Sequence, residues 1–225
     1  MNNPFKTIAL KCGQDLAYRL HMLRLRNRDF TIISNDCCAS LIYTNLRMQK
    51  DTPTCDMTIG TYNYINFCRH LKEYLTLPVD EPTEEDKKKY PGCNVPIGIL
   101  HGEPLGLRDV GLVFTHYQTL EEAREKWYRR RERVHYDNLF FILDCGTVNN
   151  EKILDAFEKL PYPNKVIFTD LKDKKRWKNT FRFSYFTAEN HQKRNHHTIV
   201  RFGPLILRGI DEFDYVGWLN RGRPK

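Results

Sequence analysis

Apolar segments and helical stripes alternate along much of the chain. Three segments are short and rich in apolar residues, as buried strands are: Phe30–Ser34, Leu139–Leu143 and Lys165–Thr169. Apolar residues at helical spacing characterise 120–134 and 151–160, on either side of the second strand. Buried strands that alternate with helices are typical of a parallel sheet covered on both faces. The pattern predicts a three-layer α/β fold, a Rossmann-like variant with a mostly parallel sheet and helices on both faces.

Two further helices and one long connection are predicted after the first strand. A short helix begins near Cys38, and another, capped by Thr61 or Asn63, carries apolar residues as far as Leu75. Residues 76–94 are rich in Pro, Glu and Lys, which indicates an exposed loop or lid rather than a linker between domains.

Additional strands are expected at Val95–Leu100 and Val110–Thr115, joined by a turn that contains Gly, Pro and His. The tail adds two aromatic-rich strands and a closing segment at 211–220. A chain of 225 residues is long enough for one sizeable core and short for two. We therefore expect a single α/β domain over 1–225.

The N-terminal segment 1–29 contains a basic amphipathic helix, predicted at Asp15–Arg28. Leu16, Leu20 and Leu23 lie on one side of this helix. One interpretation is a helix packed on the core with a solvated face. The alternative is a peripheral contact of residues 15–28 with a membrane.

The overall charge favours an anionic partner. Thirty-six Lys and Arg against 28 Asp and Glu give a net charge of +8. Nucleic acid, phosphorylated small molecules and anionic membranes all fit such an excess. No zinc finger, RNP-type strand or helix-turn-helix pattern accompanies the charge, so we expect no nucleic-acid partner.

Cysteine usage and hydropathy indicate the compartment. No apolar run approaches the roughly 20 residues that cross a bilayer, and the first 16 residues are too interrupted for a secretory signal. The seven cysteines form no CxxC pair, which predicts free thiols and no structural metal site. We expect a cytoplasmic protein, with a location peripheral to the inner membrane as the alternative.

Polar and reactive side chains follow the predicted strands. Ligands of parallel α/β proteins bind beyond the carboxyl ends of the strands, so these side chains are expected to share one rim. They are Ser34, Asn35, Cys37, His116, Tyr117, Asp144 and Asp170.

Two kinds of chemistry fit this rim. Cys37 and His116 could form a thiolate–imidazole pair, with Asp144 orienting the imidazole. Alternatively, Ser34 and Asn35 bind a phosphate at the start of the next helix without covalent chemistry. Cys37 could also be a small buried packing residue, as free cysteines commonly are.

The helix predicted at 120–134 brings arginines close to an apolar stripe. Trp127 lies in the stripe, Arg130 flanks it closely, and Arg133 lies further round. An arginine beside a buried stripe needs an anion, either an internal carboxylate or a ligand phosphate. The alternative is that these arginines complement the helix dipole and extend to water.

Several nucleotide and hydrolase motifs are absent from the sequence. There is no GxxxxGK[ST] loop, no GxGxxG after the first strand and no GxSxG elbow. No Asp-x-Asp, which would hold the divalent ion of a metal-dependent sugar-nucleotide transferase, ends an apolar strand. The sequence does not indicate which cofactor, if any, the protein uses.

The segments FTIISNDCCASLIY and FTHYQTLEEAREKWYRRRERVHYDNLFFI resemble the bacterial domain of unknown function 1919 family, as do the helix that ends at Leu75 and the PIGIL strand. The resemblance runs from about Phe30 to Ile142 and more loosely to Trp218-Leu219-Asn220. It implies a variant three-layer α/β fold and an association with exopolysaccharide and capsule biosynthesis.

The family's recurring pattern is Ser-Asn-Asn-Cys, Gly-Gly, His-Tyr, Trp-x-x-Arg-x-x-Arg and Asn-Leu-Phe. The matching positions here are Ser34, Asn35, Cys37, His116, Tyr117, Trp127, Arg130, Arg133, Asn138, Leu139 and Phe140. Asp36 stands in place of an Asn, Ala39-Ser40 in place of Gly-Gly, and Val95 in place of a Tyr.

The residues and the resemblance together predict a transferase of surface polysaccharide biosynthesis that uses a phosphorylated or acyl donor. Its ligand would be a sugar or a related small molecule. Ser34, Asn35 and Arg130 would bind the donor, and His116 would act as general base on a sugar hydroxyl. Tyr117, Trp127, Arg133 and Asn138 complete the predicted ligand-binding set. The alternatives are an acyltransferase or hydrolase acting through Cys37, and a basic adaptor that binds glycan or protein without catalysis.

Overall fold

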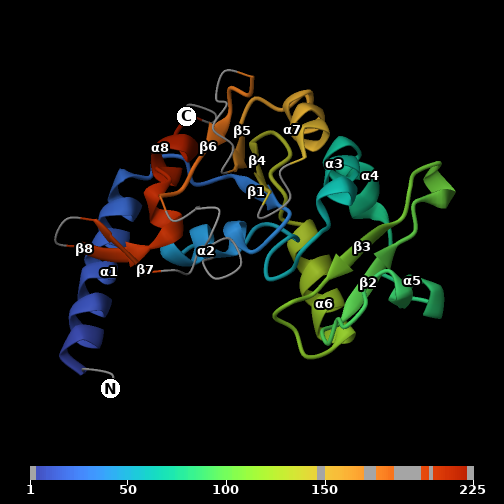
Figure 1. Ribbon diagram of the computed structural model, residues 1–225, viewed down its shortest axis with the longest axis horizontal. Helices are drawn as coiled ribbons and strands as arrows, with labels where there is room; N and C mark the ends of the chain where they lie inside the picture. The colour runs from blue at the N-terminus through green and yellow to red at the C-terminus, as the bar shows by residue number, and fades with distance from the viewer. Residues whose placement is uncertain (1–3, 146–149, 170–175, 185–198, 203–204, 222–225) are drawn as a thin grey trace.

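The computed structural model describes residues 4–145, 150–169, 176–184, 199–202 and 205–221 (Figure 1). Four parallel strands form its central sheet, in the order β1-β4-β5-β6. Their bounds are Thr31–Ser34, Leu139–Asp144, Lys165–Phe168 and Thr180–Phe181. Ile32 pairs with Phe140, Ile142 with Val166, and Ile167 with Thr180. The predicted α/β fold with a parallel sheet is confirmed.

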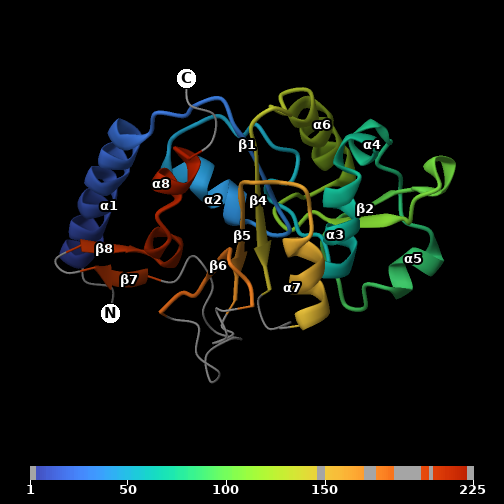
Figure 2. The same cartoon turned by 90° about the horizontal axis from the view of Figure 1, so that it is seen from above.

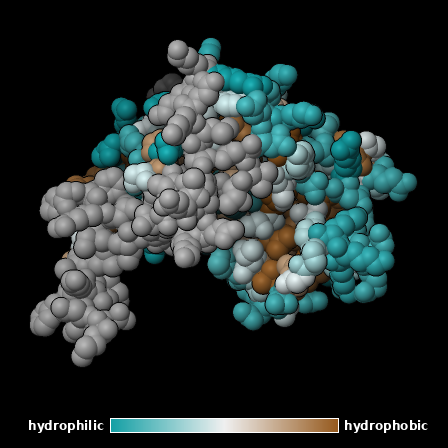
Figure 3. All heavy atoms as spheres, in the orientation of Figure 1, coloured by the Kyte–Doolittle hydropathy of each residue, from teal (hydrophilic) through white to brown (hydrophobic). Residues whose placement is uncertain are grey.

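Both faces of this sheet are buried. Ile33 and Phe141 belong to one apolar cluster, whereas their strand neighbours Ile32 and Phe140 belong to the other. Because successive side chains of a strand point to opposite faces, the two clusters are the two sides of one sheet. The molecular surface seen in the orientation of Figure 1 is largely hydrophilic where it is described, and hydrophobic residues show mainly in a hollow (Figure 3).

Helices cover both faces (Figure 2). The described residues contain eight α-helices. The face of Ile32 is covered by α2 (Cys38–Asn45) and α8 (Tyr215–Leu219). The face of Ile33 is covered by α3 (Thr61–Arg69), α4 (Leu71–Thr76), α6 (Leu120–Arg131) and α7 (Glu151–Glu158). The predicted three layers are therefore present, although the single helix expected as far as Leu75 is interrupted at His70.

The strands predicted at 95–100 and 110–115 lie outside the parallel sheet. They form β2 (Ile97–Leu100) and β3 (Val110–Val113), an antiparallel pair. Only nine residues separate them, 101–109, and a parallel crossover needs about a dozen or more. The expectation that His116 ends a strand of the parallel sheet is thus wrong.

The segment predicted as an exposed loop or lid is mostly exposed but partly ordered by local structure. It contains α5 (Glu84–Lys88), whose capping box joins Thr83 and Asp86. Val79 is buried, and the backbone of Asp80 pairs with that of Ile99. The start of this segment is therefore attached to the edge of β2.

The N-terminal helix α1 (Pro4–Arg24) is longer than predicted. It contacts β8 (Leu205–Arg208), which pairs antiparallel with β7 (Ile199–Phe202). The helix thus packs on the rest of the molecule, and its solvated face carries Leu16, Leu20 and Leu23. Among the described residues, no helix combines the length and apolar character needed to cross a membrane.

Because both faces of the sheet are buried, two neighbouring residues of β4 should be equally important for stability. Phe140→Ala and Phe141→Ala should each lower the free energy of unfolding by about 3–5 kcal/mol, because each leaves a large cavity. Urea denaturation measures both. The exposed Leu105 is the control, since its replacement by Ala should cost under about 0.5 kcal/mol. A loss below about 1 kcal/mol for either phenylalanine would contradict a sheet covered on both sides.

Candidate functional site

The carboxyl ends of β1 and β4 meet at one edge of the sheet, where Ser34 forms the turn into α2. Its hydroxyl donates to the Asp36 carbonyl oxygen at 2.6 Å and accepts from the Ala39 N–H at 3.3 Å. The side chain is almost fully buried. Ser34 therefore holds the start of α2 in place.

Asn35 extends the pairing of β1 with β4 through its side chain. Its Nδ2 donates to the Asp144 carbonyl oxygen at 2.8 Å, and its Oδ1 accepts from the Asp144 N–H at 2.7 Å. The amide thus imitates one more residue of the ladder. The predicted donor-binding groups of Ser34 and Asn35 are both engaged inside the chain, and their role toward a ligand stays a prediction.

Cys37 lies at the N-cap of α2, half-buried, with its Sγ 3.7 Å from the Thr115 hydroxyl. Burial, reinforced by the charge of Asp36, raises the pKa of its thiol to about 11. The thiolate that a nucleophile needs is disfavoured here, despite the helix start.

His116 is exposed and follows Thr115 directly, so the end of β3 does approach the end of β1. The His116 N–H donates to the Asp56 carbonyl oxygen at 3.3 Å. The ends of β3 and β1 therefore lie close together because both contact the loop that carries Asp56, and not because the two strands belong to one sheet.

Arg130 is buried and finds its anion inside the protein. Its Nη2 donates to Asp56 Oδ2 at 3.1 Å, and its Nη1 donates to the Tyr117 hydroxyl at 2.6 Å and the Cys55 carbonyl oxygen at 3.2 Å. Of the two anions that the sequence allowed, the structure provides an internal carboxylate. Tyr117, also buried, donates to the same Cys55 oxygen at 3.3 Å.

Asp56 is the centre of this cluster and was not identified from the sequence. Its backbone is left-handed, with φ +64°, a conformation that Asp tolerates better than most residues. Lys50 Nζ donates to both carboxylate oxygens at 2.8 and 2.9 Å, and Ser40 donates to one of them. Burial alone would raise the pKa of this carboxyl, but the bonds from Lys50 and Ser40 and the charge of Arg130 hold it below its ordinary value.

The remaining predicted ligand-binding residues also have internal surroundings. Trp127 is buried in the core between α6 and α3. Arg133 Nε lies 2.8 Å from Asp51 Oδ1, and Asn138 Nδ2 donates to Asn27 Oδ1 at 2.9 Å. Asp170, predicted at the end of β5, lies outside the described residues.

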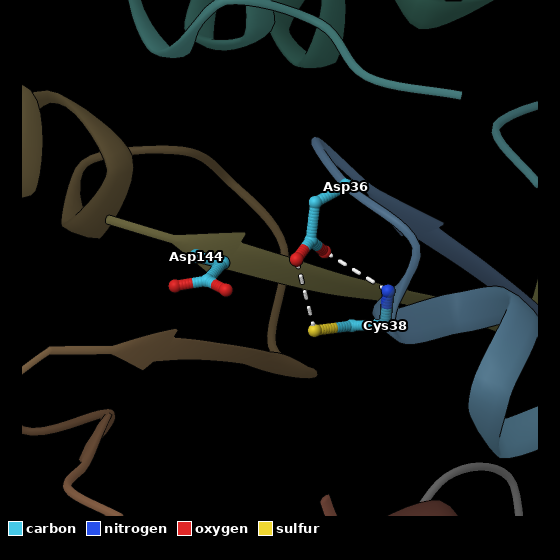
Figure 4. A group of neighbouring side chains, drawn as sticks. All are labelled: Asp36, Cys38 and Asp144. Carbon is cyan, nitrogen blue, oxygen red and sulfur yellow. Dashed lines mark hydrogen bonds between the residues drawn. The ribbon is translucent and has the colours of Figure 1, made fainter. Parts of the chain in front are cut away.

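Asp36, Cys38 and Asp144 form a group at the end of β1 and β4, with ligand atoms within 4.8 Å of one another (Figure 4). Asp36 accepts from the Cys38 N–H at 3.0 Å and from its thiol at 3.3 Å. Burial raises the pKa of the Cys38 thiol well above its ordinary value, so this thiol stays protonated. Two carboxylates remain for a hard cation such as Mg²⁺, which prefers six oxygen ligands. We assign no metal to this group.

A pocket of about 370 Å³ lies between α3 and α7. Tyr62 and Asn150, at the starts of the two helices, are joined by a 2.6 Å hydrogen bond. The segment that leads into α3 is attached to the end of β1, since the Ile59 N–H donates to the Asn35 carbonyl oxygen. Its lining residues are Tyr62, Asn63, Ile65, Asn66, Arg69, Arg108, Lys152, Ile153 and Ala156.

Cations dominate the polar lining of this pocket. Arg69, Arg108 and Lys152 are exposed, and none of the described lining residues is acidic. Tyr62 adds an exposed aromatic ring, and Asn63 and Asn66 add amides. Such a lining suits an anionic ligand that also carries hydroxyl groups.

Residues 11–220 match the family described as "Domain of unknown function (DUF1919)". The chain belongs to this family. It is also 29% identical over 222 residues to an uncharacterized protein of Haemophilus influenzae, covering 97% of this chain and 98% of that protein. The DUF1919 match extends the sequence resemblance over nearly the whole chain, including α8.

Membership of the DUF1919 family leaves the roles of its residues to be argued from geometry. Sequence reasoning missed Asp56 because a left-handed residue in an irregular loop has no periodic signal. It missed Arg69, Arg108 and Lys152 because they lie far apart in the sequence. The packing of α3 against α7 brings Arg69 and Lys152 to one pocket, and the connection between β2 and β3 adds Arg108.

The raised pKa of Cys37 predicts slow alkylation. At neutral pH, iodoacetamide should modify Cys37 at least about tenfold more slowly than the exposed Cys12. The rate at Cys37 should keep rising, by about tenfold per pH unit, from pH 7 to pH 9. Peptide mass spectrometry after timed quenching measures both sites. A rate that levels off below about pH 8 would instead indicate an activated thiol.

The ion pairs of Asp56 predict a pH-dependent loss of stability in Asp56→Asn, which keeps a residue that tolerates the left-handed backbone. At pH 7 the variant should be less stable by about 2 kcal/mol, through lost charged hydrogen bonds. A carboxyl whose folded pKa is lowered stabilises the fold above its unfolded pKa and loses that contribution as pH falls through the folded value.

The difference from wild type should therefore be constant above about pH 5 and shrink below about pH 4. Urea unfolding at a series of pH values measures it. Glu85→Gln is the control, because Glu85 forms an exposed ion pair with Lys88, which contributes little. A deficit that persists unchanged at low pH would show that the loss is steric and not ionic.

Proposed function

We propose that the protein is a transferase of surface polysaccharide biosynthesis and that its phosphorylated donor binds in the pocket between α3 and α7. The observation that supports this most is the set of three cations, Arg69, Arg108 and Lys152, around one pocket without a described acidic partner in its lining. The exopolysaccharide and capsule context comes from the sequence resemblance.

The size and chemistry of the pocket fit such a donor. A volume of about 370 Å³ lies within the usual range for small-molecule sites. Arginine forks bind phosphate oxygens in pairs, and lysine adds a mobile point charge. Tyr62 offers a flat face to a sugar or base ring, and the amides of Asn63 and Asn66 suit hydroxyl groups.

The position of the pocket supports the same proposal. Its helix α3 follows directly on a segment bonded to the carboxyl end of β1, the edge at which parallel α/β sheets bind ligands. His116 provides an exposed imidazole on the loop that approaches this edge, and the proposal assigns it as general base on an acceptor hydroxyl. Arg130 supports this loop indirectly, by holding Asp56.

The rival chemistry through Cys37 has less support. Burial and the charge of Asp36 raise the pKa of the Cys37 thiol and disfavour a thiolate, whereas a phosphorylated donor needs no nucleophilic cysteine. The adaptor alternative is favoured by one observation: Ser34, Asn35 and Arg130 are all bonded within the chain. An adaptor would bind the ligand without turning it over.

Ligand binding in the pocket predicts a charge-reversal effect. Nucleotide sugars and sugar phosphates should raise the melting temperature of the wild type, since a ligand at 100 times its Kd stabilises by about 2.7 kcal/mol. Arg69→Glu and Lys152→Glu should each weaken this binding by about tenfold or more, through the loss of charged hydrogen bonds. Thermal-shift titration gives the apparent Kd of each variant.

Lys88→Glu is the matched control, because Lys88 is an exposed lysine of α5 and its reversal changes the net charge equally. It should change the Kd by less than about twofold. Acyl-CoA and free CoA complete the panel, and a preference for acyl-CoA that the pocket variants do not alter would favour the acyl donor. Equal binding by wild type and Arg69→Glu would reject the pocket as the donor site.

A further inference from the structure

The helix α1 turns an unusual face toward the protein. Its inward side carries Ala17, Tyr18 and His21, while Leu16, Leu20 and Leu23 are 55%, 50% and 81% exposed. At about 100° per residue, positions 16, 20 and 23 fall on one stripe. Three exposed leucines on one helical face are an apolar surface without a partner in the described structure.

Specific polar contacts fix this orientation. The Tyr18 hydroxyl donates to Asp211 at 3.3 Å, and His21 Nδ1 lies 2.7 Å from the Tyr215 hydroxyl. The carbonyl of Arg24 accepts from Asn220 at 2.9 Å. Rotating the helix to bury the leucines would break these bonds, so the leucine stripe is held outward.

Basic residues surround the stripe. Residues 15–28 contain four arginines and one aspartate. Arg19 and Arg24 are well exposed, and their ion pairs with Asp15 and Asp214 are solvent-facing. Exposed pairs of this kind are weak, so both guanidinium groups remain available to another anion. Leucines flanked by arginines are the composition of a helix that lies in a membrane interface.

We propose that α1 docks on an anionic lipid surface through Leu16, Leu20 and Leu23, with the neighbouring arginines on the headgroups. Figures 1 and 2 show α1 along one end of the molecule, opposite the end that carries β2 and β3. This position at one end leaves α1 accessible to a bilayer.

A second copy of the chain fits this surface less well. Pairing of two α1 helices would bring the arginines of both copies into one interface, where like charges repel. Three leucines also supply little of the roughly 800 Å² per partner that a stable dimer buries. An anionic bilayer complements the leucines and the arginines together.

Vesicle co-sedimentation of the full chain tests the proposal. The wild type should bind vesicles of equal parts phosphatidylglycerol and phosphatidylcholine, and bind pure phosphatidylcholine at least about tenfold more weakly. Leu23→Glu and Leu20→Glu should each lower binding to the anionic vesicles by about tenfold or more. Arg19→Glu should weaken binding as well, and about 0.5 M NaCl should weaken it further.

Leu105→Glu is the matched control, since Leu105 is an exposed leucine of the connection between β2 and β3, and it should bind like the wild type. Because all these side chains are exposed, every variant should keep the melting temperature of the wild type.

Wild-type protein that does not bind anionic vesicles, or Leu23→Glu that binds them equally well, overturns the proposal. A dimer in analytical ultracentrifugation that Leu23→Glu dissociates, without vesicle binding, assigns the stripe to a second copy instead. Nucleotide-sugar binding in the pocket is a separate measurement, so either proposal can fail alone.

Discussion

The pairing of β1 with β4 is the interaction on which the described structure depends. Thr31 pairs with Leu139, so the long stretch between the two strands must leave the sheet and return. Closing so long a loop costs entropy, and burial of apolar side chains on both faces of the strands offsets it. Asn35 lengthens this ladder with its side chain and so fixes where the two strands end relative to each other.

A second constraint is the buried charge of Arg130. A guanidinium removed from water needs acceptors for its donors, and the carboxylate of Asp56, the hydroxyl of Tyr117 and the carbonyl of Cys55 provide them. These contacts join α6 to the loop before α3, and through Ser40 to α2. The left-handed backbone of Asp56 is stable here because its side chain and carbonyl are held from several directions.

Most residues that resemble the family's recurring pattern therefore hold the fold. Ser34, Asn35 and Arg133 each bond to neighbouring backbone or side chains. His116 is an exposed exception, and the other exposed groups with a proposed role lie in the cationic pocket between α3 and α7 and on the outer face of α1. Arg69, Arg108 and Lys152 line the pocket, and Arg19 and Arg24 flank the exposed leucines of α1.

The sequence by itself determined the local elements, because strand and helix formation follow from the spacing of nearby apolar residues. The parallel sheet, α6 and α7 were predictable in this way. It also indicated that Arg130 needs an anion, because the helical repeat of about 100° per residue places Arg130 beside the apolar stripe that contains Trp127. Tertiary structure alone decided which anion that is, because Asp56 comes from a loop without periodicity. It also decided that β2 and β3 form a separate antiparallel pair, and that α1 turns Tyr18 and His21 inward and its leucines outward. Each of these outcomes depends on contacts between residues distant in the chain, and the spacing of apolar residues within one segment cannot predict such contacts.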